Sequence, residues 1–217
     1  MSEVIVTVRG EQERRVTPEH AVVQLAVRAD GPERGPVIER VTALAEPLRD
    51  DLVAHQRSGE VVEWSSGRVS VWSERPWNTE GRQLPPVHHA SIDVTATFRD
   101  FVALSWWIGE VAETDAVQVT DVRWDLSPAT RAEVEREVAA EAVQVAVERA
   151  RAYAGALGLE SVSPLEMADA GLLLPHPDRG GPQMMRAMAA ESSGPGVALQ
   201  PADIVVSAAV EARFLAR

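Results

Sequence analysis

Two adjacent histidines, His88 and His89, are the residues of this chain whose types most directly suggest chemistry. They stand in the stretch PPVHHASIDVTATF, residues 85–98, and Asp93 follows them by five and four residues. Imidazole and carboxylate groups together can hold a divalent metal ion or transfer a proton. Polar and apolar residues alternate after the histidines, and this alternation predicts a strand.

A strand would separate these groups. Neighbouring side chains on a strand point to opposite faces, so His89 shares a polar face with Asp93, while His88 starts an apolar face. His89 and Asp93 are then about 13 Å apart at roughly 3.3 Å per residue. A site would need groups from another element, for which the candidates are His55, Glu74 and Asp125. We therefore predict no catalytic residue and no metal site from this stretch.

The loop before this strand is the second candidate site. Its sequence, SERPWNTEGRQLPP, carries Arg75, Trp77 and Arg82 among turn residues. Exposed tryptophan and arginine side chains are enriched at the centres of protein interfaces. We predict that Arg75, Trp77 and Arg82, with His88 and His89, contact a partner subunit or a ligand.

Composition favours an acidic, soluble globular protein. The chain has 33 acidic and 21 basic residues, a net charge of -12, so it would repel nucleic acid. It has no cysteine, which excludes disulfides and thiolate chemistry. Phosphate loops, metal motifs and nucleophile motifs are missing from the sequence, so we expect no cofactor and lean towards a protein that is not an enzyme.

The sequence also predicts a location. MSEVIVTVRGEQ enters a strand pattern directly, without the basic and apolar regions of a signal peptide. No apolar run approaches the roughly 20 residues that cross a bilayer. We expect a cytoplasmic protein without a membrane partner.

Sequence patterns outline the elements that position the candidate site. Strands are predicted at residues 4–10, 21–30, 60–74, 87–98, 116–126, 162–168 and 203–214, with a polar hairpin after Gly10 and a bulge at residues 65–67. An amphipathic helix runs from Val37 to Leu52 and is kinked or divided at Pro47. A second helix follows Asp100, and a long alanine-rich helix follows Ser127. This order predicts an α+β fold with a largely antiparallel sheet and helices on one face.

Three segments carry more specific predictions. Ala142, Ala146, Ala150 and Ala154 recur every four residues, which permits the long helix to approach a sheet closely. Trp106 and Trp107 are about 100° apart on a helix, so at most one lies at the centre of its buried stripe. Residues 171–201 are predicted to form a mobile insertion in a single domain of residues 1–217. Within it, Met184, Met185 and Met188 form either a docking helix or part of a disordered segment.

The chain resembles the SIMPL-domain family over nearly its whole length. The resembling stretches are IVTVRGEQERRVTPEHAVVQLAV, HHASIDVTATFRDF, DVRWDLSPATRAEVEREVAAEAVQVAVERARAYAGALGLESVSPLEMAD and PADIVVSAAVEARF. These are structural rather than catalytic signatures, so the resemblance implies a fold and no activity. Relatives include a signalling protein associated with a pelle-like kinase, and periplasmic and outer-membrane immunogenic proteins that resemble ring-forming or channel-like homo-oligomers.

Three hypotheses of function follow. The first is a non-enzymatic structural or interaction module that self-associates and has a possible protein partner. The alternative is a small-ligand-binding protein or hydrolase with a pocket near residues 75–89. The third, which rests on the resemblance alone, is an envelope-facing channel.

Overall fold

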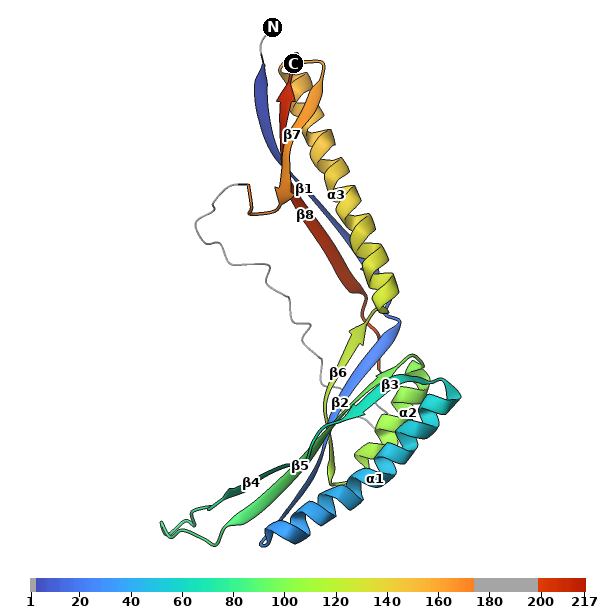
Figure 1. The fold of residues 1–217 in the computed structure, drawn as a ribbon, viewed down its shortest axis with the longest axis vertical. Coiled ribbons are helices and arrows are strands. Elements are labelled where there is room, and N and C mark those ends of the chain that lie inside the picture. Colours follow the sequence, from blue (N-terminus) through green and yellow to red (C-terminus); the bar gives the residue numbers. More distant parts are fainter. Residues whose placement is uncertain (1–2, 174–198) are drawn as a thin grey trace. The chain divides into compact units, whose positions relative to one another are not determined.

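A computed structural model of the chain describes residues 3–173 and 199–217 (Figure 1). Its backbone contacts divide these residues into two compact units. Unit 1 holds β1 (Val4–Val16), α3 (Pro128–Ala156), β7 (Val162–Asp169) and β8 (Ile204–Ala216). Unit 2 holds β2 (His20–Gly31), α1 (Arg34–Ser58), β3 (Val61–Ser66), β4 (Ser70–Glu74), β5 (Val87–Phe98), α2 (Phe101–Ala112) and β6 (Val117–Asp125).

The α+β fold class is confirmed. In residues 3–173 and 199–217, the strands form two antiparallel sheets where the sequence suggested one. The sheet of unit 1 has the order β1-β8-β7, and that of unit 2 has the order β3-β5-β2-β6, with β4 also paired to β5. The single domain predicted over residues 1–217 stays a prediction. Most of the predicted insertion at 171–201, including the methionine cluster, lies outside the described residues.

In unit 2, both helices contribute to one core on one face of the sheet. The apolar faces of β2 and β5 meet the buried sides of α1 and α2 there. Phe98 and Trp107 are fully buried, and their ring centroids lie 5.2 Å apart. The apolar face predicted for the strand after His88 is thus confirmed, from Ala90 to Phe98.

Helix α1 continues through Pro47 as one helix of 25 residues, so a division into two helices there is wrong. Proline removes the hydrogen bond to the carbonyl four residues earlier, which belongs to Ala43. Both Pro47 and Ala43 are exposed, so water can satisfy that carbonyl. Val37, Val41, Leu48 and Leu52 meanwhile hold the opposite side of the helix in the core.

The strand predicted at residues 60–74 is two strands, because its interruption is longer than a bulge. β3 pairs with residues 94–98 of β5, and β4 pairs with residues 87–91 of the same strand. Between them, the Gly67 amide donates a 2.7 Å hydrogen bond to the carbonyl of Asp93. The chain therefore stays beside β5 while its regular pairing is broken.

In unit 1, β1 passes straight through Gly10, so both the strand end and the polar hairpin predicted there are wrong. All 13 residues from Val4 to Val16 pair with β8, and β1 and β2 belong to different sheets. The polar residues after Gly10 keep the alternation because their side chains find partners on α3. Gln12 donates a 2.9 Å hydrogen bond to Glu141, and Arg14 pairs with Glu137 and Glu141.

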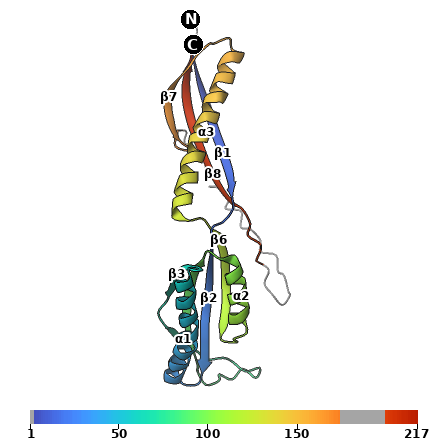
Figure 2. The same cartoon turned by 90° about the vertical axis from the view of Figure 1, so that its right-hand side faces the viewer.

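Gly10 has a different role from the one that its sequence position suggests. It is buried beneath α3, where an added Cβ would lie 2.0 Å from the carbonyl oxygen of Ala142 and 2.9 Å from the Cβ of Ala146. All four alanines of the predicted ridge are buried in the core of unit 1. The close approach predicted for them is confirmed, and α3 lies along one face of its sheet (Figure 2).

Candidate functional site

The candidate site residues all belong to the hairpin of β4, β5 and the loop between them. This hairpin extends from the sheet of unit 2, away from α2 (Figure 1). His88 and His89 begin β5 at the base of the loop, and Arg75, Trp77 and Arg82 lie within it. The structure thus assigns the five predicted residues to one hairpin but not to one pocket.

The two histidines have separate surroundings, as the strand geometry predicted. The His89 ring stacks on Trp72, with 5.4 Å between centroids and 17° between planes. Its buried Nε2 lies 3.4 Å from Oε1 of Glu74, without a hydrogen bond between them. Nδ1 of His88 instead forms a 2.7 Å hydrogen bond with the hydroxyl of exposed Ser73.

Of the three residues proposed to complete a site with the histidines, Glu74 lies near one of them. His55 is hydrogen-bonded to Glu60, and Oδ2 of Asp125 lies 3.6 Å from a guanidinium nitrogen of Arg123. Among the described residues, no group of three His, Asp or Glu side chains is arranged to hold a metal ion. The stack of His89 on Trp72 and the hydrogen bond of His88 with Ser73 thus link β4 to β5 at the base of the hairpin.

The loop is shaped by a turn around Asn78. The Asn78 side-chain oxygen accepts hydrogen bonds from the backbone amides of Glu80 and Arg82, at 3.1 and 2.7 Å. Trp77 forms an isolated β-bridge with Gln83. The turn leaves the Trp77 side chain 67% exposed and both Arg75 and Arg82 exposed. An exposed indole between two cations is suited to contact another surface.

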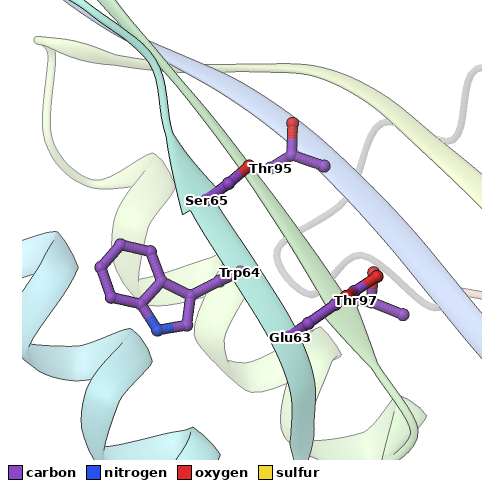
Figure 3. Close-up of a pocket in the computed structure, with 5 residues that line it drawn as sticks. All are labelled: Glu63, Trp64, Ser65, Thr95 and Thr97. Carbon is purple, nitrogen blue, oxygen red and sulfur yellow. The ribbon is translucent and has the colours of Figure 1, made fainter.

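A hollow of about 190 Å³ lies on the other part of β5, next to β3 (Figure 3). Glu63, Ser65, Thr95 and Thr97 lie on one side of the two strands, whereas Trp64 points towards the helices. Three hydroxyls and one carboxylate offer hydrogen bonds to a polar molecule. The hollow contains none of the five predicted site residues, and its chemistry is that of a solvated sheet surface.

A second hollow, of about 430 Å³, lies in unit 1 at the end of α3. Its lining includes Arg151, Gly155 and Ser161. Arg151 is its one cation, and no second basic side chain adjoins it in that lining. It shares no residue with the hairpin of unit 2.

The sequence reasoning missed a hydrogen-bonded cluster at the end of α1. His55 Nδ1 lies 2.6 Å from Oε2 of Glu60, and the Ser58 hydroxyl donates a 2.8 Å hydrogen bond to the same oxygen. The bond to His55, followed by that to Ser58, lowers the pKa of Glu60. Here the carboxylate receives both hydrogen bonds, whereas in a catalytic triad the histidine lies between the other two groups. The cluster therefore stabilises the C-terminal end of α1.

The sequence reasoning also missed the outer face of α2. Val102 and Trp106 are 68% and 73% exposed, while the neighbouring Trp107 is 1% exposed. The prediction that at most one of the paired tryptophans lies in the buried stripe is thus confirmed. A run such as FVALSWWIGEVA, apolar on nearly every side, was the signal that could have identified this face.

Comparison with known proteins identifies a family and no activity. The model of the SIMPL family, described as "Protein of unknown function (DUF541)", matches residues 6–214. No curated protein gives a significant match. Separately, no helix in the described part of the chain is both long and apolar enough to span a membrane.

Proposed function

The chain belongs to the SIMPL family, whose function is unknown, and from that premise we propose that it is a non-catalytic module that self-associates and presents its hairpin to protein partners. The observation that carries the proposal is the exposed Trp77 between two exposed arginines in that hairpin. Aromatic rings lose little side-chain entropy on binding and bury a large area, so they are frequent anchors in interfaces.

The surroundings of the histidines also favour an interaction role. Trp72 and Glu74 surround His89, and Ser73 contacts His88, so both rings help to hold the hairpin together. A hairpin that is ordered before binding loses less entropy when it binds. This arrangement supports a preformed docking element.

Measurement of the oligomeric state tests the self-association. We expect the mass of the full-length protein, measured by light scattering, to rise above 23.5 kDa with concentration across the micromolar range. A second series should use the variant Trp77→Ala, in which the rise is expected to move to higher concentration. A strictly monomeric wild-type protein throughout this range would overturn the proposal.

A second candidate, a hydrolase or small-ligand-binding protein near residues 75–89, has one specific observation in its favour. The 2.7 Å contact between Ser73 and His88 has the composition of a nucleophile and its base. A hydrolase of this kind would lose turnover of its substrate in Ser73→Ala and in His88→Ala, while binding it with little change. A broad screen of esters and amides that finds no turnover by the wild-type protein removes this candidate.

A further inference from the structure

Helix α2 presents to solvent a face that is apolar at one end and acidic at the other. Val102, Trp106, Glu110 and Glu113 are all exposed. Their spacing of four, four and three residues puts them on one side of the helix. We call these four residues the helix patch. No arginine, lysine or histidine occurs between Arg99 and Arg123, so this region of the sequence is entirely acidic in its charges.

The acidic end of the helix patch is electrostatically unfavourable in a single copy. The C-terminal end of a helix carries a partial negative charge, which repels carboxylates. Glu110 lies in the last turn of α2, Glu113 is the C-cap, and the last turn has no basic residue. In residues 3–173 and 199–217, neither carboxylate forms an ion pair. Cations from outside the unit would offset this repulsion.

The hairpin has the complementary composition. Arg75, Trp77, Arg82 and Leu84 are exposed, and we call them the hairpin patch. Across the part of the chain that the structure describes, neither arginine forms an ion pair. The loop of the hairpin, residues 75–86, contains two arginines and one acidic residue, against a net charge of -12 for the whole chain. This loop is therefore a locally basic segment on an acidic protein.

We propose that the hairpin patch of one copy docks on the helix patch of a second copy. Trp77 and Leu84 would cover Val102 and Trp106, and the two guanidinium groups would pair with Glu110 and Glu113. Arginine binds carboxylates through two parallel hydrogen bonds and stacks on indole rings, so both parts of the helix patch suit the hairpin. This inference rests on the proposed self-association and names its two surfaces.

The charges of the two patches favour a second copy of this chain as the partner of the helix patch. Each copy carries one patch of each kind, so the chain supplies both partners in equal number. The two patches are different surfaces, so a single contact between two copies leaves one patch of each kind open. These open patches either pair with each other, which closes a dimer or a ring, or bind further copies in a filament.

Two complementary variants of the full-length chain test this contact. The hairpin variant carries Arg75→Gln, Trp77→Ala and Arg82→Gln. The helix variant carries Trp106→Ala, Glu110→Gln and Glu113→Gln. Each has lost one patch, so each alone is expected to remain a monomer under conditions in which the wild-type protein associates. Circular dichroism checks that both are folded.

Mixing the two variants is the decisive measurement. The intact hairpin of one can bind the intact helix patch of the other, and the two altered patches prevent further growth. Light scattering of the mixture should thus give a complex of twice the 23.5 kDa of one chain. A control, Glu39→Gln with Glu46→Gln, removes two exposed carboxylates from α1 and should associate as the wild-type protein does.

The outcomes separate this inference from the proposed function. A mixture that remains monomeric, while the wild-type protein self-associates, overturns the contact between hairpin and helix patch and leaves self-association standing. A control that also loses association overturns it too, because general charge reduction would then explain the result. A wild-type protein that is always monomeric overturns both.

Discussion

At Gly10, the missing side chain is what allows α3 to approach its sheet so closely. A Cβ at this position would overlap the backbone of α3 at Ala142, and backbone cannot rotate away as a side chain does. The same overlap explains why the sequence was misleading here. A glycine in a strand pattern signals either a strand end or a close backbone approach, and the partner helix lies more than a hundred residues away in the sequence.

Replacing Gly10 by alanine should therefore destabilise unit 1. We expect Gly10→Ala to lower the free energy of unfolding by about 1–3 kcal/mol or more, as overpacking does. The matched control is Gly155→Ala in α3, where an added Cβ meets no atom within 4 Å. That change should raise the free energy by about 0.5–1 kcal/mol, because alanine favours a helix. Urea unfolding followed by circular dichroism measures both, and equal effects would contradict the close approach.

The cluster around Glu60 predicts a pH dependence. Its hydrogen bond from His55 lowers the pKa of Glu60 below the ordinary 4.5 in the folded state. A carboxylate of this kind stabilises the fold fully above pH 4.5 and loses that contribution as the pH falls through its folded-state pKa. Glu60→Gln should thus lose less stability than the wild-type protein on acidification through this range. Thermal unfolding at a series of pH values tests this, and parallel curves would refute it.

The candidate site was predictable only as far as local geometry decides it. Strand alternation was sufficient to separate His88 from His89, because that geometry depends on neighbouring residues alone. The stacking of His89 on Trp72 depends on the register between β4 and β5, which the sequence does not encode locally. The cluster of His55, Ser58 and Glu60 spans a helix end and was missed because none of its residues forms a familiar motif.

At the scale of elements, α2 buries one of two consecutive tryptophans and exposes the other. Trp107 fills the core of unit 2, packed against Phe98 and close to the ring of His55. Trp106 belongs to the exposed helix patch. The two side chains are chemically identical, so they give a matched pair for measuring what burial contributes.

We expect Trp107→Ala to cost about 3–5 kcal/mol of unfolding free energy, as large-to-small core changes do. Trp106→Ala should alter it by less than about 0.5 kcal/mol, because no packing is lost in a single copy. Chemical denaturation at a concentration that keeps the protein monomeric compares the two. A large loss with Trp106→Ala would show that this ring is covered within its own chain.

The helices and most strands were located correctly from the sequence, and the exceptions have physical reasons. The 3.6-residue period of α1 and α3 depends only on the residues of each helix, so the sequence reveals it. The ridge of alanines also indicated close packing correctly. β1 was predicted too short because its polar second half is held by Glu137 and Glu141 of α3. α1 was predicted to be kinked or divided at Pro47, whereas it continues as one helix. The solvent exposure of Pro47, which permits this, depends on packing that the sequence does not specify.

At the scale of the whole molecule, the described residues form two units with cores of their own. The cores of unit 1 combine α3 with β1 and β8, whereas that of unit 2 combines α1 and α2 with β2 and β5. Strand patterns could not predict this division, because alternation identifies a strand but not its neighbour. It is the pairing of β1 with β8, from opposite ends of the sequence, that produces a separate sheet.

Separate cores predict separate responses to a local change. Gly10→Ala should increase hydrogen exchange at backbone amides of β1, β8 and α3, whose packing it disturbs. Amides in the helices and central strands of unit 2 should exchange at nearly the wild-type rate, because Gly10 belongs to unit 1 and its added Cβ would meet Ala142 and Ala146 of α3. Exchange measured by mass spectrometry on peptides from both units decides this. A uniform increase would mean that the two cores unfold as one.

The pairing of β1 with β8 also sets an order of events on the ribosome. Synthesis delivers β1 first, yet its only described strand partner begins at Ile204, and all 13 of its residues pair there. The strands and helices of unit 2 are contiguous from His20 to Asp125 and have been made long before then. A nascent chain thus carries β1 without its strand partner while the residues between β1 and β8 are translated. The alternating Arg9, Glu11, Glu13 and Arg15 keep this unpaired strand hydrated.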